Sequence, residues 1–132
     1  MSTWDLLGGD AVMEPLLADF YRRIAASPIA PLFPPGVGEP GSETFRKQFA
    51  FQSDFWGGPL RYAPWRGHPR MRMRHLPFPI DQAAADTWMG CMTAAVEASA
   101  MPVSLRADYL LQMRDIAQAM INRSETPGGS SP

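Results

Sequence analysis

The residues best suited to chemistry in this chain lie in one short run, "RMRMRHLPF", which spans residues 70–78. In this run His75 follows an alternation of arginine and methionine and comes two residues before Pro77. An alternation of period two is typical of a strand, whereas a cluster of arginines is typical of a nucleic-acid-binding patch. Neither interpretation gives His75 a function, so the histidine itself has to be explained.

A structural zinc site is not expected around His75. The other histidine, His68, lies seven residues earlier, and Cys91 is the single cysteine, far from both in sequence. Structural zinc sites draw four ligands from cysteine and histidine. We therefore expect His68 to be a helix cap or a surface residue.

Composition and charge bound the class of protein. The 132 residues are enough for one domain, and 45% hydrophobic with 19% charged residues is a globular profile. A net charge of -1 gives no general argument for a nucleic-acid or membrane partner. The basic residues are clustered in one segment, because five of the arginines fall between Arg61 and Arg74.

The cellular compartment is predicted from cysteine usage and from the N-terminus. One cysteine excludes an internal disulfide and fits a reducing compartment. The start "MSTWDLLGGD" lacks the basic and apolar regions of a signal peptide, and no run approaches the ~18 apolar residues of a membrane span. We expect a cytoplasmic protein with a disordered tail at 124–132.

The N-terminal third predicts two helices. Ser2 and Asp5 have the spacing of a capping box, and Gly8-Gly9 ends the short helix that follows. After Asp10, apolar residues at helical spacing predict a second helix, whose regular part we expect to start late because of Pro15.

The middle of the chain is interrupted by proline and glycine. The stretch 27–41 predicts an irregular connector. Ser42 then caps a helix to about Trp56, the stretch 59–68 predicts a loop, and a short helix is expected between Pro69 and Pro77.

Two long helices are expected to complete the chain. Asp81 caps the first, with a length of about 19 residues or roughly 28 Å. Ser104 is the predicted cap of the last helix. No segment predicts a strand, so the fold class is all-α.

The helix after Ser42 has an unusual face. Thr44 and Gln48 lie one turn apart, next to the aromatic Phe51 and Phe55. One interpretation is a face that touches solvent. The other is a polar pair over a pocket, where a ligand supplies the missing hydrogen-bond partners.

Several motifs together resemble one family. They are "FY" on the second helix, a phenylalanine after a proline-rich corner, "ETFRKQ", "FWGGP", "RGHPRMRMRHLPFPI", and a tryptophan followed by a cysteine. In this order they resemble the group II truncated haemoglobins, over roughly Trp4 to Arg123. The resemblance implies a 2-on-2 α-helical sandwich around haem b, with a globin domain at 1–123.

The resemblance also implies the iron ligand. His75 would be the proximal ligand, since haem iron takes a neutral imidazole held by a second hydrogen bond. Met71, one turn earlier, would lie against the porphyrin. The alternative is a histidine on a solvated basic helix.

Other family positions carry over as the walls of the haem pocket. Tyr21, Trp88, Thr44 and Gln48 would form the distal set around a bound ligand, although Tyr21 and Trp88 could instead be core residues. Many group II members have an apolar residue where Gln48 stands. Phe33 would pack on the haem face, where other members have tyrosine or histidine. The haem contacts expected in addition are Phe51, Phe55, Lys47, Tyr62 and Arg72, the last three with Arg66 as candidates for the propionates.

The predicted function follows from the polar distal set. Hydrogen-bond donors aimed at a bound ligand stabilise negative charge on it, so we expect reversible binding of O₂, with CO and NO as further ligands, and slow O₂ release. Slow release suits oxygen transport poorly and suits NO dioxygenase or peroxidase-like chemistry with peroxide, which would need a separate reductase. A gas sensor and a haem-free helical nucleic-acid-binding module are the alternatives. We expect no nucleic acid and no membrane as partners, and the family often forms homodimers.

Overall fold

The computed structural model describes residues 1–68, 70, 73, 75 and 77–123, and over these residues the chain is helical without strands. The elements are α1 (Thr3–Leu7), α2 (Gly9–Ala25), the 3₁₀-helix η1 (Ala30–Leu32), α3 (Glu43–Phe55), α4 (Tyr62–Arg66), α6 (Gln82–Glu97) and α7 (Val103–Ala119). The predicted disordered tail lies outside the described residues. No helix of the described residues is long and apolar enough to cross a bilayer.

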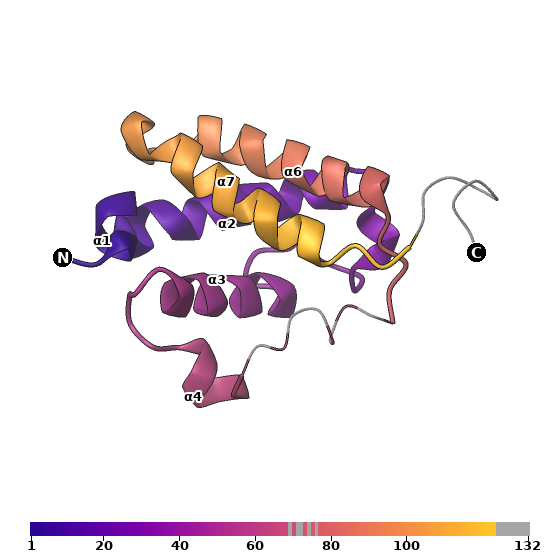
Figure 1. Cartoon of the computed structure of the whole chain (residues 1–132), viewed down its shortest axis with the longest axis horizontal. Coiled ribbons are helices and arrows are strands. Elements are labelled where there is room, and N and C mark those ends of the chain that lie inside the picture. Colours follow the sequence, from indigo (N-terminus) through magenta and orange to yellow (C-terminus); the bar gives the residue numbers. More distant parts are fainter. Residues whose placement is uncertain (69, 71–72, 74, 76, 124–132) are drawn as a thin grey trace.

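The four long helices form two layers. Helix α2 packs against both α3 and α6, and α6 packs against α7. Figure 1 shows α6 and α7 running along one side of the molecule, with α3 below them. This arrangement is a sandwich of two helices on two, and it confirms the predicted all-α fold.

The core lies mainly among α1, α2, α6 and α7. Its large side chains are almost completely shielded from solvent. The apolar spacing along α2, α6 and α7 places these side chains on the inward faces of the helices. The largest fully buried side chains are Trp4, Met13, Leu16, Leu17, Phe20, Ile24, Gln52, Met92, Val96, Met101, Tyr109 and Met113. Gln52 is the single amide in this set.

Side-chain caps fix the starts of α1, α3 and α6 where the sequence predicted them. Ser2 and Asp5 form a capping box at α1, and Gly8 ends that helix with a φ of 121°. Ser42 accepts a hydrogen bond from the Phe45 amide at 3.2 Å, and Asp81 accepts one from the Ala84 amide at 2.8 Å. These caps confirm the predicted starts of α3 and α6.

Five predictions about the elements were wrong. Helix α2 starts at Gly9 and keeps Pro15 in its interior, because the buried side chains on either side of the proline hold the helix together. Helix α7 starts at Val103 after Pro102, and Ser104 does not cap it. Helix α6 has 16 residues rather than 19, and the predicted irregular connector contains η1.

The fifth error is the predicted loop at 59–68, which contains helix α4. Asp54 at the end of α3 accepts hydrogen bonds from three backbone amides at the start of α4, those of Arg61 at 2.6 Å, Tyr62 at 3.1 Å and Ala63 at 2.8 Å. A carboxylate thus replaces the missing helical partners of these amides. Asp54 lies outside the stretch 59–68, so the composition of that stretch could not predict these hydrogen bonds.

A second set of contacts anchors the same corner. Arg61 forms a paired contact with Asp10 on α2, at 2.9 and 2.8 Å, and the Ser53 hydroxyl donates to the carbonyl of Pro59 at 2.6 Å. Helix α4 is therefore fixed to both α2 and α3.

Candidate functional site

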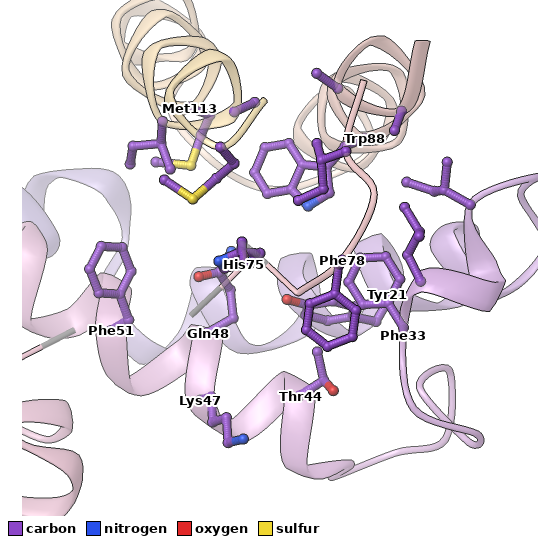
Figure 2. A pocket seen from close by; sticks show the side chains of 18 of the residues that line it. Tyr21, Phe33, Thr44, Lys47, Gln48, Phe51, His75, Phe78, Trp88 and Met113 are labelled. Carbon is purple, nitrogen blue, oxygen red and sulfur yellow. The ribbon is translucent and has the colours of Figure 1, made fainter. Parts of the chain in front are cut away.

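One large cavity lies between α3 and the α6–α7 pair. Its volume is about 640 Å³, and side chains from α2, α3, α6 and α7 point into it (Figure 2). The lining is mostly apolar. The residues that line it are Tyr21, Ile29, Leu32, Phe33, Pro34, Thr44, Lys47, Gln48, Phe51, Gln52, Tyr62, Arg66, His75, Phe78, Ile80, Ala84, Ala85, Trp88, Met113, Ile116, Ala117 and Met120.

The cavity brings together most of the residues that the sequence singled out. Ten of them line it, namely Tyr21, Phe33, Thr44, Lys47, Gln48, Phe51, Tyr62, Arg66, His75 and Trp88. Phe55 does not: its side chain is 44% exposed and packs on Phe51 and Trp56 at the end of α3. Met71 and Arg72 lie outside the described residues.

Several hydrogen-bonding side chains line this cavity without a partner among the described residues. The Thr44 hydroxyl is one, and the others are the Tyr21 hydroxyl, the side-chain amide of Gln48 and the Trp88 indole. Figure 2 shows them converging from α2, α3 and α6. Polar groups left without partners at a cavity wall are the expected property of a ligand site.

Packing and burial determine the state of Tyr21. Burial raises the pKa of its hydroxyl, and the nearby Tyr109 raises it further. Tyr21 therefore stays protonated near neutral pH and can donate a hydrogen bond. Its ring and that of Trp88 both pack edge-on against Phe20, with centroids 4.8 and 5.0 Å away, which limits their movement.

The mouth of the cavity is positively charged. Lys47 and Arg66 both approach Glu43, at 3.2 and 4.0 Å, and Arg46 and Arg66 lie over the Trp65 ring at 5.2 and 5.4 Å. Lys47 and Arg66 line the cavity and share one carboxylate, so these three side chains have a surplus of one positive charge. Cations at this place suit a ligand that carries carboxylates.

His75 lies in helical backbone conformation and reaches the cavity from the segment before α6. Its carbonyl accepts hydrogen bonds from the amide of Phe78 at 3.0 Å and from the side chain of Asn122 at 3.1 Å. Asn122 was not predicted, since nothing in the sequence relates it to His75, 47 positions away.

A buried polar pair beside the cavity was also missed. Gln52 is 0% exposed and accepts a hydrogen bond of 2.5 Å from the Tyr109 hydroxyl, while its amide nitrogen lies 3.7 Å from the Met113 sulfur. The sequence did contain a pattern that could have predicted Gln52, because this residue is one helical turn beyond Gln48 on the same side of α3.

The residues present fit haem b. A flat apolar cofactor with two carboxylates needs a largely apolar cavity of roughly 300–1,000 Å³, an imidazole for the iron and cations at the edge. The cavity offers an apolar interior, His75, and the charge surplus around Lys47 and Arg66. Over the described residues no group of three or more His, Cys, Asp or Glu side chains offers a different metal site.

Comparison with known proteins agrees with this geometry. The model of the family "Bacterial-like globin" matches residues 2–122. Group 2 truncated hemoglobin YjbI of Bacillus subtilis is 36% identical over 124 residues, which cover 93% of this chain and 91% of that protein.

Solved structures match over nearly the whole chain. The group II truncated hemoglobin from Bacillus anthracis has a TM-score of 0.89 at 32% identity, covering 97% of this chain and 96% of its own. The truncated oxygen-avid haemoglobin from Bacillus subtilis has a TM-score of 0.85 at 33% identity, covering 92% and 100%. The hemoglobin of Chloroflexus aurantiacus has a TM-score of 0.84 at 38% identity, covering 93% and 99%.

Sequence, fold and cavity therefore lead to one assignment. This chain belongs to the bacterial-like globin family, as a haem-b-binding truncated haemoglobin of group II.

Proposed function

We propose that this globin binds O₂ and other diatomic ligands reversibly and releases O₂ slowly, with His75 as the iron ligand. One observation carries the proposal: the Tyr21, Gln48 and Trp88 donors, which have no partner among the described residues, line the same cavity as His75. When bound, haem would supply the iron atom to which the gas binds.

The protein side chains set the strength of binding. A bound oxygen molecule carries partial negative charge, and each donor aimed at it stabilises the bound state. A hydrogen bond to a charged acceptor contributes about 1.5–3 kcal/mol, and 1.4 kcal/mol is a factor of ten in affinity. The similarity to a structure described as oxygen-avid supports the same conclusion.

The iron-ligand assignment is tested by His75→Ala. Purified wild-type protein reconstituted with hemin should show a Soret band, and the variant should shift or weaken that band. His68→Ala is the matched control, because His68 does not line the cavity. A wild-type-like spectrum for His75→Ala would refute the role of His75.

The oxygen-binding role is tested by the O₂ dissociation rate in stopped flow. Trp88→Phe and Gln48→Leu should each release O₂ about tenfold faster or more, since each removes one donor. Trp65→Phe and Gln112→Leu are the controls, because both side chains are exposed and neither lines the cavity. Unchanged rates in both cavity variants would contradict the proposed donor set.

Slow release also favours a redox role over oxygen carriage. A protein that holds O₂ tightly delivers little of it, whereas the same donors can assist the consumption of NO or peroxide. Turnover assays with NO and with hydrogen peroxide, each with a reductant supplied, separate these reactions. Loss of turnover in Trp88→Phe, with haem still bound, would assign that reaction to the cavity.

A further inference from the structure

Asn122 joins the end of the last helix to the segment that carries His75. Its side-chain nitrogen donates to the carbonyl of His75 at 3.1 Å and to that of Phe78 at 2.9 Å. Its side-chain oxygen accepts from the amide of Ile80 at 3.0 Å, and its own backbone amide donates to the carbonyl of Ile80 at 2.8 Å. One residue therefore makes four hydrogen bonds to the six-residue stretch 75–80.

These contacts use the full capacity of a carboxamide. Both hydrogens of its nitrogen have acceptors, and its oxygen also accepts from the Arg123 guanidinium at 3.0 Å. Aspartate could keep the contact with the Ile80 amide but would place an oxygen against two carbonyls. The position thus requires an amide rather than polarity in general.

The carbonyl of His75 is held from two directions. The Phe78 amide, 3.0 Å away, belongs to the same turn, whereas Asn122 belongs to the chain end after α7. The turn alone leaves the orientation of this segment relative to the sandwich undetermined. Asn122 supplies that link, because α7 packs on α6 and is part of the rigid fold.

We propose that Asn122 is a positioning residue for His75, which fixes the backbone of the iron ligand against the end of α7. The proposal rests on the proposed role of His75. When a residue that orients a metal ligand without touching the metal is mutated, the affinity for the metal commonly falls about 10- to 100-fold. Here the orienting contact acts on the backbone of the ligand.

The test compares Asn122→Ala with Gln118→Ala, which removes an exposed amide one turn earlier on α7. Hemin-loaded protein is mixed with excess apomyoglobin, and hemin transfer is followed by absorbance. Asn122→Ala should lose hemin about tenfold faster than wild type, while Gln118→Ala should match wild type. Equal rates for all three proteins would overturn the proposal.

A spectroscopic measurement separates positioning from general stability. The iron–histidine stretching band of the ferrous protein should shift or broaden in Asn122→Ala and stay unchanged in Gln118→Ala. An unchanged band, even with faster hemin loss, would mean that Asn122 only stabilises the fold. Asn122→Asp keeps the acceptor for Ile80 and loses both donors, so it should behave like Asn122→Ala; wild-type behaviour would overturn the role of the donors.

His75→Ala, measured alongside, keeps the two proposals apart. If its iron–histidine band is the same as in wild type, the ligand assignment itself fails. If that band disappears while both Asn122 variants resemble wild type, His75 remains the ligand and the inference about Asn122 fails.

Discussion

Gln52 and Tyr109 illustrate how much one buried pair can matter. The amide oxygen of Gln52 accepts from the Tyr109 hydroxyl inside the core, and the ring of Tyr109 stacks on Trp56 at 5.6 Å. Burial raises the pKa of Tyr109, so the hydroxyl remains a donor near neutral pH. Each partner satisfies a group that would otherwise be buried without a hydrogen bond.

We predict that Gln52→Leu lowers the free energy of unfolding by about 1–3 kcal/mol, because the Tyr109 hydroxyl loses its strong acceptor. Tyr109→Phe should have a cost of similar size. The double variant should cost less than the sum, since no polar group remains unpaired. Urea unfolding of the four proteins measures this, and strictly additive effects would show that the pair is not coupled.

At the scale of elements, the corner between α3 and α4 depends on ionised carboxylates. Burial tends to raise the pKa of Asp54, but the backbone amides of Arg61, Ala63 and Tyr62 lower it more, so the net shift is downward. The hydrogen bond from Arg61 likewise lowers the pKa of Asp10. Helix α4 contributes Tyr62 and Arg66 to the cavity, so this corner supports the site.

The sign of the pH dependence follows from these directions. A carboxylate whose pKa is lower in the folded state stabilises the fold above its unfolded pKa, near 3.8, and this stabilisation is lost as the pH falls through the folded value. Asp54→Asn should therefore be less stable than wild type at pH 7 and lose less stability on acidification. Asp108→Asn, an exposed change on α7, is the control. Parallel pH curves for Asp54→Asn and wild type would contradict the prediction.

At the scale of the whole molecule, the cavity makes stability depend on haem. A ligand that binds only the folded state stabilises it by about 2.7 kcal/mol at a free concentration 100 times its dissociation constant. Haem removal should thus lower Tm, and Tm should rise with added hemin. Thermal unfolding followed by circular dichroism tests this. In His75→Ala, added hemin is expected to raise Tm by less than in wild type. Equal Tm values with and without hemin would mean that the cavity does not bind it.

The sequence by itself determined the fold class and predicted ten of the residues that line the cavity as candidates for the site. Helical spacing, the caps at Ser2, Ser42 and Asp81, and the motif around His75 are local patterns, and local patterns act before any tertiary contact forms. The family motifs predicted Tyr21 and Trp88 as site residues, and helical spacing also singled out Gln48.

Only the tertiary structure decided which distant groups meet. Helix α4 exists because Asp54 supplies partners for its first amides, Gln52 is tolerated in the core because Tyr109 reaches it, and His75 is joined to Asn122 across 47 residues. The hydrogen-bond donors and acceptors that each residue carries can be read from the sequence. Which partner satisfies each one depends on how the chain packs, and packing is a property of the whole fold.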